Sequence, residues 1–210
     1  MDKIILALPK GRILKDLELF FRDRNIIADP ELFDDSSRKL TFKCNIENIE
    51  IIKVRSFDVA TIVKFGGADV GICGKDVIEE FPSDQYYPVI DLKIGQCRLS
   101  LAKSNSHDVK NFDDKITIAT KYVNITQNYF EKLGMQPEII KLNGALEIAP
   151  KIGLSNYIID LVSSGKTLQE NNLQEITKIL EVNSFLIVNR TSLKTKNFVL
   201  NNLIKLFDVK

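Results

Sequence analysis

A strand, a turn rich in hydroxyls and a helix start follow one another over residues 158–168 of this chain. The strand carries one acid, Asp160, near its carboxyl end, and the turn contains Ser163, Ser164 and Gly165. Backbone N–H groups at such a turn and at a helix N-terminus lack intrahelical partners and attract an anion. Because a carboxylate beside a bound phosphate can accept hydrogen bonds from hydroxyls, this arrangement suits a sugar phosphate.

The run Ser164-Gly165-Lys166-Thr167 also looks like the end of a nucleotide P-loop, whose pattern is G-x-x-x-x-G-K-[ST]. The first glycine of that pattern would stand at position 160, which is Asp. A carboxylate there would project into the loop that must wrap a polyphosphate, so the residues disfavour a P-loop kinase or GTPase. An ordinary strand–turn–helix, in which Ser163 or Ser164 caps the helix, stays open as an alternative.

Basic residues stand at three other turns, where they could bind phosphate charge. Lys10, Gly11 and Arg12 place two cations around a glycine at a predicted helix start, which suits a polyphosphate. Arg38 belongs to a second basic pair, and Arg55 follows a predicted strand. Arginine makes bidentate bonds to phosphate. Solvated surface charge is the alternative at each of these positions.

Two further turns combine glycine with charge after predicted strands. Gly74, Lys75 and Asp76 open a short predicted helix, and residues 66–76 are dense in glycine, which permits close approach of a ligand or of backbone. Glu147 stands at another helix start, where it could bind sugar hydroxyls or offset the helix dipole. The sequence offers no Ser/His/Asp set and no HExxH motif, so covalent or metalloprotease chemistry has no support. We expect the single histidine, His107, to lie in a surface loop.

Alternating strand and helix signals would position these turns. Predicted strands cover residues 4–8, 40–44, 49–54, 69–73, 89–92, 97–102, 116–119, 138–142, 157–162, 176–180 and 185–188. Predicted helices cover residues 13–21, 59–65, 123–133, 144–151 and 192–207. We expect Asp58 to cap the second helix, and Phe198, Leu203, Leu206 and Phe207 to form the apolar face of the last one.

This alternation predicts parallel α/β sheets whose faces are covered by helices. Ligands of such folds bind at the carboxyl ends of the strands. The turns at residues 9–12, 74–76, 143–147 and 160–167 all follow predicted strands, so they could converge on one cleft.

Composition limits the class of function. The 210 residues fit one large or two small domains, and 44% hydrophobic with 27% charged residues is typical of a soluble globular protein. A net charge of +1 gives no general attraction to nucleic acid or membranes, and no apolar run reaches membrane-spanning length. The N-terminus enters a strand directly, without a secretion signal. The three separated cysteines indicate buried free thiols, so we expect a cytoplasmic protein.

Several motifs in order make the chain resemble the short-form ATP phosphoribosyltransferases. They are Leu8–Ile13, Ser37–Leu40, Gly67–Ile72, Gly74–Asp76, Asp91–Cys97, Ile118–Tyr122, Lys141–Glu147 with Ala149-Pro150, and Asp160–Leu168. The resemblance spans essentially the full chain. It implies an α/β, two-lobed fold similar to type II periplasmic binding proteins, with a ligand cleft between the lobes. We expect residues 1–92 plus 184–210 to form lobe I and residues 93–183 to form lobe II.

The resemblance also implies a reaction, the first step of histidine biosynthesis. N1 of ATP attacks C1 of phosphoribosyl pyrophosphate, with Mg²⁺, and the products are phosphoribosyl-ATP and pyrophosphate. Asp160 would hold ribose hydroxyls, and Glu147 would lie near the ribose or the metal. The 5-phosphate would be bound by Ser163, Ser164, Gly165, Lys166 and Thr167.

Charge and nucleotide contacts follow from the same resemblance. Pyrophosphate or triphosphate charge would face Lys10, Gly11, Arg12, Arg38 and Arg55, with the three arginines as the catalytic candidates. Gly74, Lys75 and Asp76 would lie at the nucleotide. Two positions depart from the family: Ser164 replaces a usual threonine and keeps its hydroxyl, and Asn156 replaces a frequent aspartate, so we assign it no catalytic role.

The resemblance implies partners as well. Long forms carry an extra C-terminal regulatory domain, for which this chain has no room. Short forms instead assemble with a regulatory subunit resembling histidyl-tRNA synthetase, as a homodimer within a hetero-octamer, and Arg38 could act across the dimer interface. The competing hypothesis is a non-catalytic two-lobed module that closes on a small anion.

Overall fold

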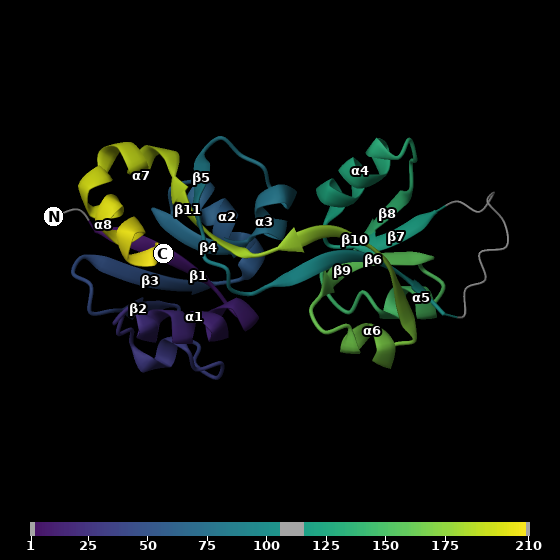
Figure 1. Ribbon diagram of the computed structural model, residues 1–210, viewed down its shortest axis with the longest axis horizontal. Coiled ribbons are helices and arrows are strands. Elements are labelled where there is room, and N and C mark those ends of the chain that lie inside the picture. Colours follow the sequence, from purple (N-terminus) through teal and green to yellow (C-terminus); the bar gives the residue numbers. More distant parts are fainter. Residues whose placement is uncertain (1–2, 106–115, 209–210) are drawn as a thin grey trace. The chain divides into compact units, whose positions relative to one another are not determined.

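The computed structural model describes residues 3–105 and 116–208, which form two compact units (Figure 1). Unit 1 comprises Met1–Gly95 and Asn183–Lys210, and unit 2 is the continuous segment Gln96–Val182. The sequence-based boundaries stood at residues 92 and 184. His107 lies outside the described residues, as does most of the polar stretch around it.

Unit 1 is built on a six-stranded mixed sheet in the order β2-β3-β1-β4-β11-β5. Its strands are β1 (Ile4–Pro9), β2 (Thr41–Lys43), β3 (Ile49–Val54), β4 (Val70–Gly74), β5 (Tyr86–Asp91) and β11 (Ser184–Asn189). Strand β1 runs parallel to β3 and β4, whereas β2, β11 and β5 pair antiparallel with their neighbours. The predicted parallel pairing is therefore present only among β1, β3 and β4, and the sheet as a whole is mixed. The short connection from β2 to β3 allows only an antiparallel pair, because parallel strands need a long crossover.

Helices cover both faces of this sheet. They are α1 (Arg12–Asp23), the 3-10 turn η1 (Pro30–Leu32), α2 (Ser56–Lys64), α3 (Lys75–Glu80), α7 (Arg190–Thr195) and α8 (Asn197–Phe207). Alternation along β1 sends Leu6 to one face and Ala7 to the other. Leu6 packs in a core with residues of α1 and α8, such as Leu17 and Leu203, while Ala7 packs in a core formed with α2 and α3.

Two helix predictions in unit 1 were wrong in detail. Helix α2 begins at Ser56, so Asp58 lies in its first turn, where a carboxylate favours the helix dipole, and does not cap it. The last predicted helix divides at Lys196, whose Nζ lies 2.9 Å from the buried Asp69 carboxylate. Leu203 and Phe207 are buried as expected, but Phe198 is 80% exposed and does not belong to the apolar face.

Unit 2 is built on a five-stranded mixed sheet in the order β10-β6-β9-β7-β8. Its strands are β6 (Cys97–Ser104), β7 (Thr117–Thr120), β8 (Glu138–Lys141), β9 (Tyr157–Val162) and β10 (Leu173–Val182). Strands β7, β8 and β9 are parallel, and β6 pairs antiparallel with both β9 and β10. Helix α4 (Val123–Lys132) lies on one side of the sheet, and α5 (Ile148–Lys151) and α6 (Lys166–Glu170) on the other (Figure 1).

Several predicted features of the chain have shifted limits in the structure. Only residues 148–151 of the helix predicted over 144–151 are helical, and β10 is longer than its predicted core of 176–180. Cys73 and Cys97 are buried, whereas Cys44 is only partly so, and all three are free thiols. Among the described residues, no helix combines the length and hydropathy that crossing a lipid bilayer requires.

Candidate active site

In unit 2, strand β9 places Asp160 in a half-buried position beside two charged side chains. Its Oδ1 accepts a hydrogen bond from the Leu161 amide at 2.8 Å and lies 3.6 Å from Lys121 Nζ. Burial raises the pKa of the Asp160 carboxyl, the Lys121 ammonium opposes that rise, and the neighbouring Glu147 carboxylate adds to it. Both predicted acids, Asp160 and Glu147, therefore belong to unit 2 and influence each other electrostatically.

Lys121 is a candidate site residue for which we predicted no role from the sequence. It directly follows β7, whose last residue, Thr120, is level with Ile159 of β9. The buried Thr120 hydroxyl donates to the Ile159 carbonyl at 2.8 Å and accepts from the Tyr122 amide at 3.0 Å. These bonds fix the turn from which Lys121 reaches Asp160. The available sequence signal was a cation placed directly after a parallel strand.

The turn after β9 is the candidate phosphate loop, Ser163–Thr167, and most of it is exposed. Gly165 has a φ of 79°, a left-handed conformation that favours glycine. Ser164 Oγ accepts a long hydrogen bond of 3.4 Å from the Lys166 amide. Helix α6 has only five residues, so its dipole is small, and the loop's own amides and hydroxyls must supply the anion contacts. The exposed Lys166 pairs with Glu170 at 3.7 Å.

In unit 1, the parallel strands β1, β3 and β4 all finish on the same side of the sheet. We call the side at which their carboxyl ends lie the carboxyl edge. Pro9 pairs with Val54, so the following residues, Lys10 and Arg55, leave the sheet side by side. Strand β4 runs parallel to β1 on its other side, with Gly71 level with Ala7, and ends at Gly74. The turns of three predicted site segments therefore meet within unit 1.

Arg38 reaches the same carboxyl edge from an antiparallel strand. It lies just before β2, and the Leu40 carbonyl accepts a hydrogen bond of 2.8 Å from the Lys53 amide near the end of β3. The preceding loop is held by the buried Lys53 Nζ, which donates to the carbonyls of Leu32 and Asp34 at 3.0 and 3.1 Å. A buried ammonium thus fixes the segment that leads to Arg38.

The cations at the carboxyl edge differ in how they are bound. The charged groups of Lys10, Arg38 and Arg55 are exposed and have no hydrogen bond or ion pair within residues 3–105 and 116–208. Arg12 Nη2 donates to the Gly95 carbonyl at 3.2 Å, so this arginine also ties α1 to that turn. Lys39, in contrast, pairs with Asp29 at 2.5 Å.

The predicted nucleotide segment is placed less favourably for direct contact. Gly74 is buried at the end of β4, and the Lys75 amide donates to the Asn183 carbonyl at 2.8 Å. Asp76 is 5% exposed, so its carboxylate faces the interior of unit 1. Asn156, to which we assigned no catalytic role, makes a structural contact: its Oδ1 accepts from the Thr117 hydroxyl at 2.6 Å and from the Thr117 amide at 3.1 Å.

Comparison with known proteins identifies a family of similar sequences. The family model described as HisG, ATP phosphoribosyltransferase, matches residues 55–208. An ATP phosphoribosyltransferase of Novosphingobium aromaticivorans is 47% identical over 207 residues, which cover 97% of this chain and 93% of the relative. One of Rhizorhabdus wittichii is 48% identical over 198 residues, which cover 92% of this chain and 89% of that protein.

Comparison with solved structures leads to the same family. The Thermotoga maritima ATP phosphoribosyl transferase (HisG:HisZ) complex contains a chain that is 30% identical, with a TM-score of 0.81 and coverage of 97% of this chain and 96% of that one. A Candida albicans protein with the generic periplasmic binding protein fold has a TM-score of 0.62 at 12% identity, covering 99% and 70%, which supports the fold alone. The chain therefore has a two-lobed α/β fold similar to type II periplasmic binding proteins and belongs to the ATP phosphoribosyltransferase family.

Proposed function

We propose that the two units divide the substrates' charge in the family's pentosyl transfer from phosphoribosyl pyrophosphate to N1 of ATP. Unit 2 would bind the ribose 5-phosphate part, through Asp160, Glu147 and the loop Ser163–Thr167. Unit 1 would present Lys10, Arg12, Arg38 and Arg55 to the pyrophosphate or triphosphate charge. The observation that carries this proposal is the half-buried Asp160, which lies 3.6 Å from Lys121 Nζ on the strand that leads into the loop Ser163–Thr167.

The chemistry favours such a division. Displacement of pyrophosphate from C1 builds positive charge on the ribose and negative charge on the leaving group. Preplaced cations stabilise the leaving group without reorganisation during the reaction, and the three exposed cations at the carboxyl edge are not engaged elsewhere in the described residues. Half-buried carboxylates can accept hydrogen bonds from ribose hydroxyls, while Lys121 limits the repulsion between them. The attacking group belongs to ATP, so the protein needs no nucleophile of its own.

Magnesium would enter with the phosphates of the substrates. No group of three or more His, Cys, Asp or Glu side chains suited to a metal occurs within the described parts of the chain. Oxygen donors suit Mg²⁺, which usually keeps waters and takes one or two carboxylates plus substrate phosphates. Glu147 is the carboxylate that fits this role next to Asp160. Bound magnesium would share the negative charge of the leaving pyrophosphate.

The proposal includes a partner. The Thermotoga maritima structure is a HisG:HisZ complex, and its 30% identical chain matches 97% of this one. We therefore propose that this chain assembles with a histidyl-tRNA-synthetase-like regulatory subunit, as a homodimer within a hetero-octamer, in the cytoplasm. Within the homodimer, the exposed Arg38 would act across the interface.

Substitution of the carboxyl-edge arginines tests the assignment. We expect Arg38→Ala and Arg12→Ala each to lower kcat/KM by about 100-fold, the scale for loss of one charge-stabilising donor, with the circular dichroism spectrum unchanged. Pyrophosphate release from ATP and phosphoribosyl pyrophosphate is measured for the chain alone and co-expressed with the regulatory subunit. Arg22→Ala, at the opposite end of α1, is the matched control and should keep full activity.

The same assay separates the enzyme from the competing hypothesis of a binding module. A fully active Arg12→Ala/Arg38→Ala double variant would refute the assignment of these residues. Tight binding of phosphoribosyl pyrophosphate without pyrophosphate release, even with the regulatory subunit present, would instead favour a non-catalytic anion-binding module.

A further inference from the structure

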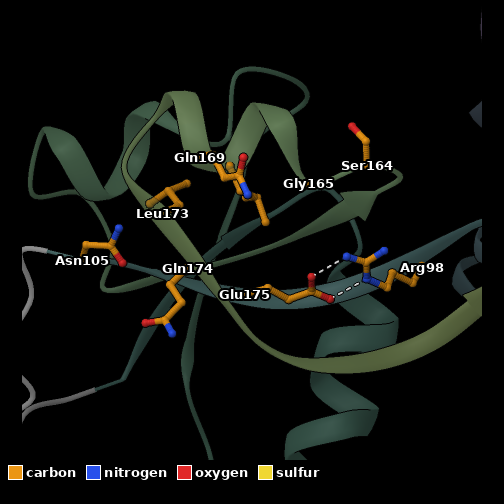
Figure 2. A pocket seen from close by; sticks show the side chains of 9 residues that line it. Arg98, Asn105, Ser164, Gly165, Gln169, Leu173, Gln174 and Glu175 are labelled. Atoms are coloured by element: carbon orange, nitrogen blue, oxygen red, sulfur yellow. Dashed lines mark hydrogen bonds and ion pairs between the residues drawn. The ribbon is translucent and has the colours of Figure 1, made fainter.

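Arg98 stands on β6 of unit 2, next to the phosphate loop, and every nitrogen of its guanidinium has a protein partner. Its Nε and Nη2 each lie 2.6 Å from an oxygen of the Glu175 carboxylate, which makes a bidentate pair. The Ser100 hydroxyl donates to the same carboxylate at 2.8 Å. The remaining Nη1 donates to the Ser163 carbonyl at 3.1 Å. Figure 2 shows Arg98 and Glu175 facing each other beside the Ser164–Gly165 turn.

This network lies along one wall of a pocket of about 570 Å³ that the phosphate loop also lines, through Ser164 and Gly165. The Arg98 hydrogen bonds hold the pKa of the Glu175 carboxyl below its usual range, so the pair stays charged at neutral pH. Planar bidentate pairs are stronger and geometrically stricter than single surface ion pairs. Arg98 is therefore fixed in direction by β10, and it is already neutralised. An arginine with these features is better suited to support the loop than to bind phosphate directly.

The contact with Ser163 has a consequence for the next peptide group. The described chain has no cis peptide bond, and in a trans peptide the C=O and the following N–H point in opposite directions. Holding the Ser163 carbonyl toward Arg98 therefore turns the Ser164 N–H to the other side of the chain. If this peptide group rotated, the Ser163 carbonyl oxygen would take the place of the Ser164 N–H. A carbonyl oxygen that faces a phosphate repels it.

We propose that Arg98 is a positioning residue for the 5-phosphate of phosphoribosyl pyrophosphate. By holding the Ser163 carbonyl, it keeps this acceptor out of the phosphate cradle and directs the Ser164 amide into it. Glu175 and Ser100 in turn fix the guanidinium. The proposal rests on the proposed function, because it requires the loop Ser163–Thr167 to bind that phosphate.

The test measures KM separately for the two substrates in the full chain with its regulatory subunit. Arg98→Ala should raise KM for phosphoribosyl pyrophosphate roughly tenfold, the scale of one well-formed hydrogen bond, and leave KM for ATP and kcat within about twofold. Glu175→Gln keeps the shape and loses the charge, so a smaller increase in the same KM is expected. Added guanidinium ion should restore the affinity of Arg98→Ala, whereas ammonium should not, because only guanidinium has the planar fork.

Controls separate this role from general destabilisation. Arg190→Ala removes another arginine that pairs with a carboxylate, Asp84 at 3.4 Å in unit 1, and should change neither KM. An unchanged KM for phosphoribosyl pyrophosphate in Arg98→Ala, or an equal rise in both KM values without rescue by guanidinium, would overturn the proposal. If Arg98→Ala does not fold, the KM values for the two substrates are compared instead in Glu175→Gln and Arg98→Lys. Lack of pyrophosphate release by the wild-type complex would instead overturn the proposed function, independently of these variants.

Discussion

Burial of the Asp160 carboxyl opposes folding at neutral pH, although we propose that this carboxylate binds ribose hydroxyls. Burial and the nearby Glu147 both raise its carboxyl pKa, and the Lys121 ammonium only partly compensates. A group with a raised pKa in the folded state holds its proton at pH values where the unfolded chain has lost it. Its contribution to stability is therefore present at low pH and falls as the pH rises through the folded pKa.

We accordingly expect Asp160→Asn to raise the free energy of unfolding at pH 7, because the amide carries no charge into this site and can still accept the Leu161 hydrogen bond. The gain should disappear toward pH 4, near the ordinary carboxyl pKa of 3.8. Activity should fall at least about 100-fold, since ribose hydroxyls lose a charged acceptor. Thermal unfolding between pH 4 and 8, with pyrophosphate-release kinetics, checks both effects. The exposed acid Asp35 provides the control, Asp35→Asn, which should hardly change the free energy of unfolding at pH 7. A variant that is less stable at pH 7 would contradict this account.

At the residue scale, sequence reasoning found what is local along the chain. Asp160 and the loop after it form one contiguous stretch, so their types and order were readable. Lys121 and Arg98 were missed as site residues because their roles depend on strand pairing. Lys121 reaches Asp160 only since β7 lies beside β9, and Arg98 meets Glu175, 77 positions away, only through β10.

At the scale of elements, the packing of α2 on β4 depends on one glycine. A Cβ added at Gly71 would lie 2.7 Å from Cγ1 of Val59 and 2.8 Å from Cγ2 of Val63. Both valines are fully buried on α2. Helix α2 starts directly after Arg55, so this close approach also sets where one cation of the carboxyl edge is held.

We expect Gly71→Ala to destabilise the protein by about 2 kcal/mol, the usual cost of overpacking a dense core. Shortening the facing side chain should relieve it: Gly71→Ala/Val59→Ala should lose less stability than the sum of the two single variants, because contacting residues are not additive. Urea unfolding of the four proteins measures this coupling. Gly144→Ala is the matched control, since no atom lies within 4 Å of its added Cβ, and its stability should hardly change. Additive losses in the double variant would show that the contact is not the cause.

The limits of individual strands were predicted more reliably than the pairing of strands within the sheets. Strand β9 has the limits that its apolar run indicated, and β2 and β3 fall within their predicted ranges of 40–44 and 49–54. Periodicity carries no information on which strands pair, so the antiparallel entry of β11 between β4 and β5 could not be foreseen. The break at Lys196 was also missed. Lys196 pairs there with Asp69, more than a hundred residues earlier, a contact that sequence periodicity does not reveal.

At the scale of the whole molecule, unit 2 is one continuous insertion into unit 1. Its first and last strands pair antiparallel, and Cys97 is level with Val182 where the chain enters and leaves. Its two ends therefore lie side by side and are tied by its own sheet. The candidate ribose-phosphate residues all lie inside the insertion, whereas the carboxyl-edge cations all belong to unit 1.

The excised segment 96–182 should therefore fold alone and retain part of the binding. Its five-stranded sheet, a hydrophobic cluster that includes Ala119 and Ile158, and the Arg98–Glu175 pair are all formed by residues of the segment itself. We expect a cooperative thermal transition and binding of ribose 5-phosphate with an affinity within about tenfold of the full chain, because each ligand contact in question is local. Phosphoribosyl pyrophosphate should lose more affinity than ribose 5-phosphate, since its pyrophosphate no longer meets the cations of unit 1. Isothermal titration calorimetry measures both ligands, with Asp160→Asn in the same segment as the control that should weaken them equally. Equal losses for the two ligands on excision would contradict the division of charge between the units, and a segment that folds but binds neither would place the ribose-phosphate contacts elsewhere.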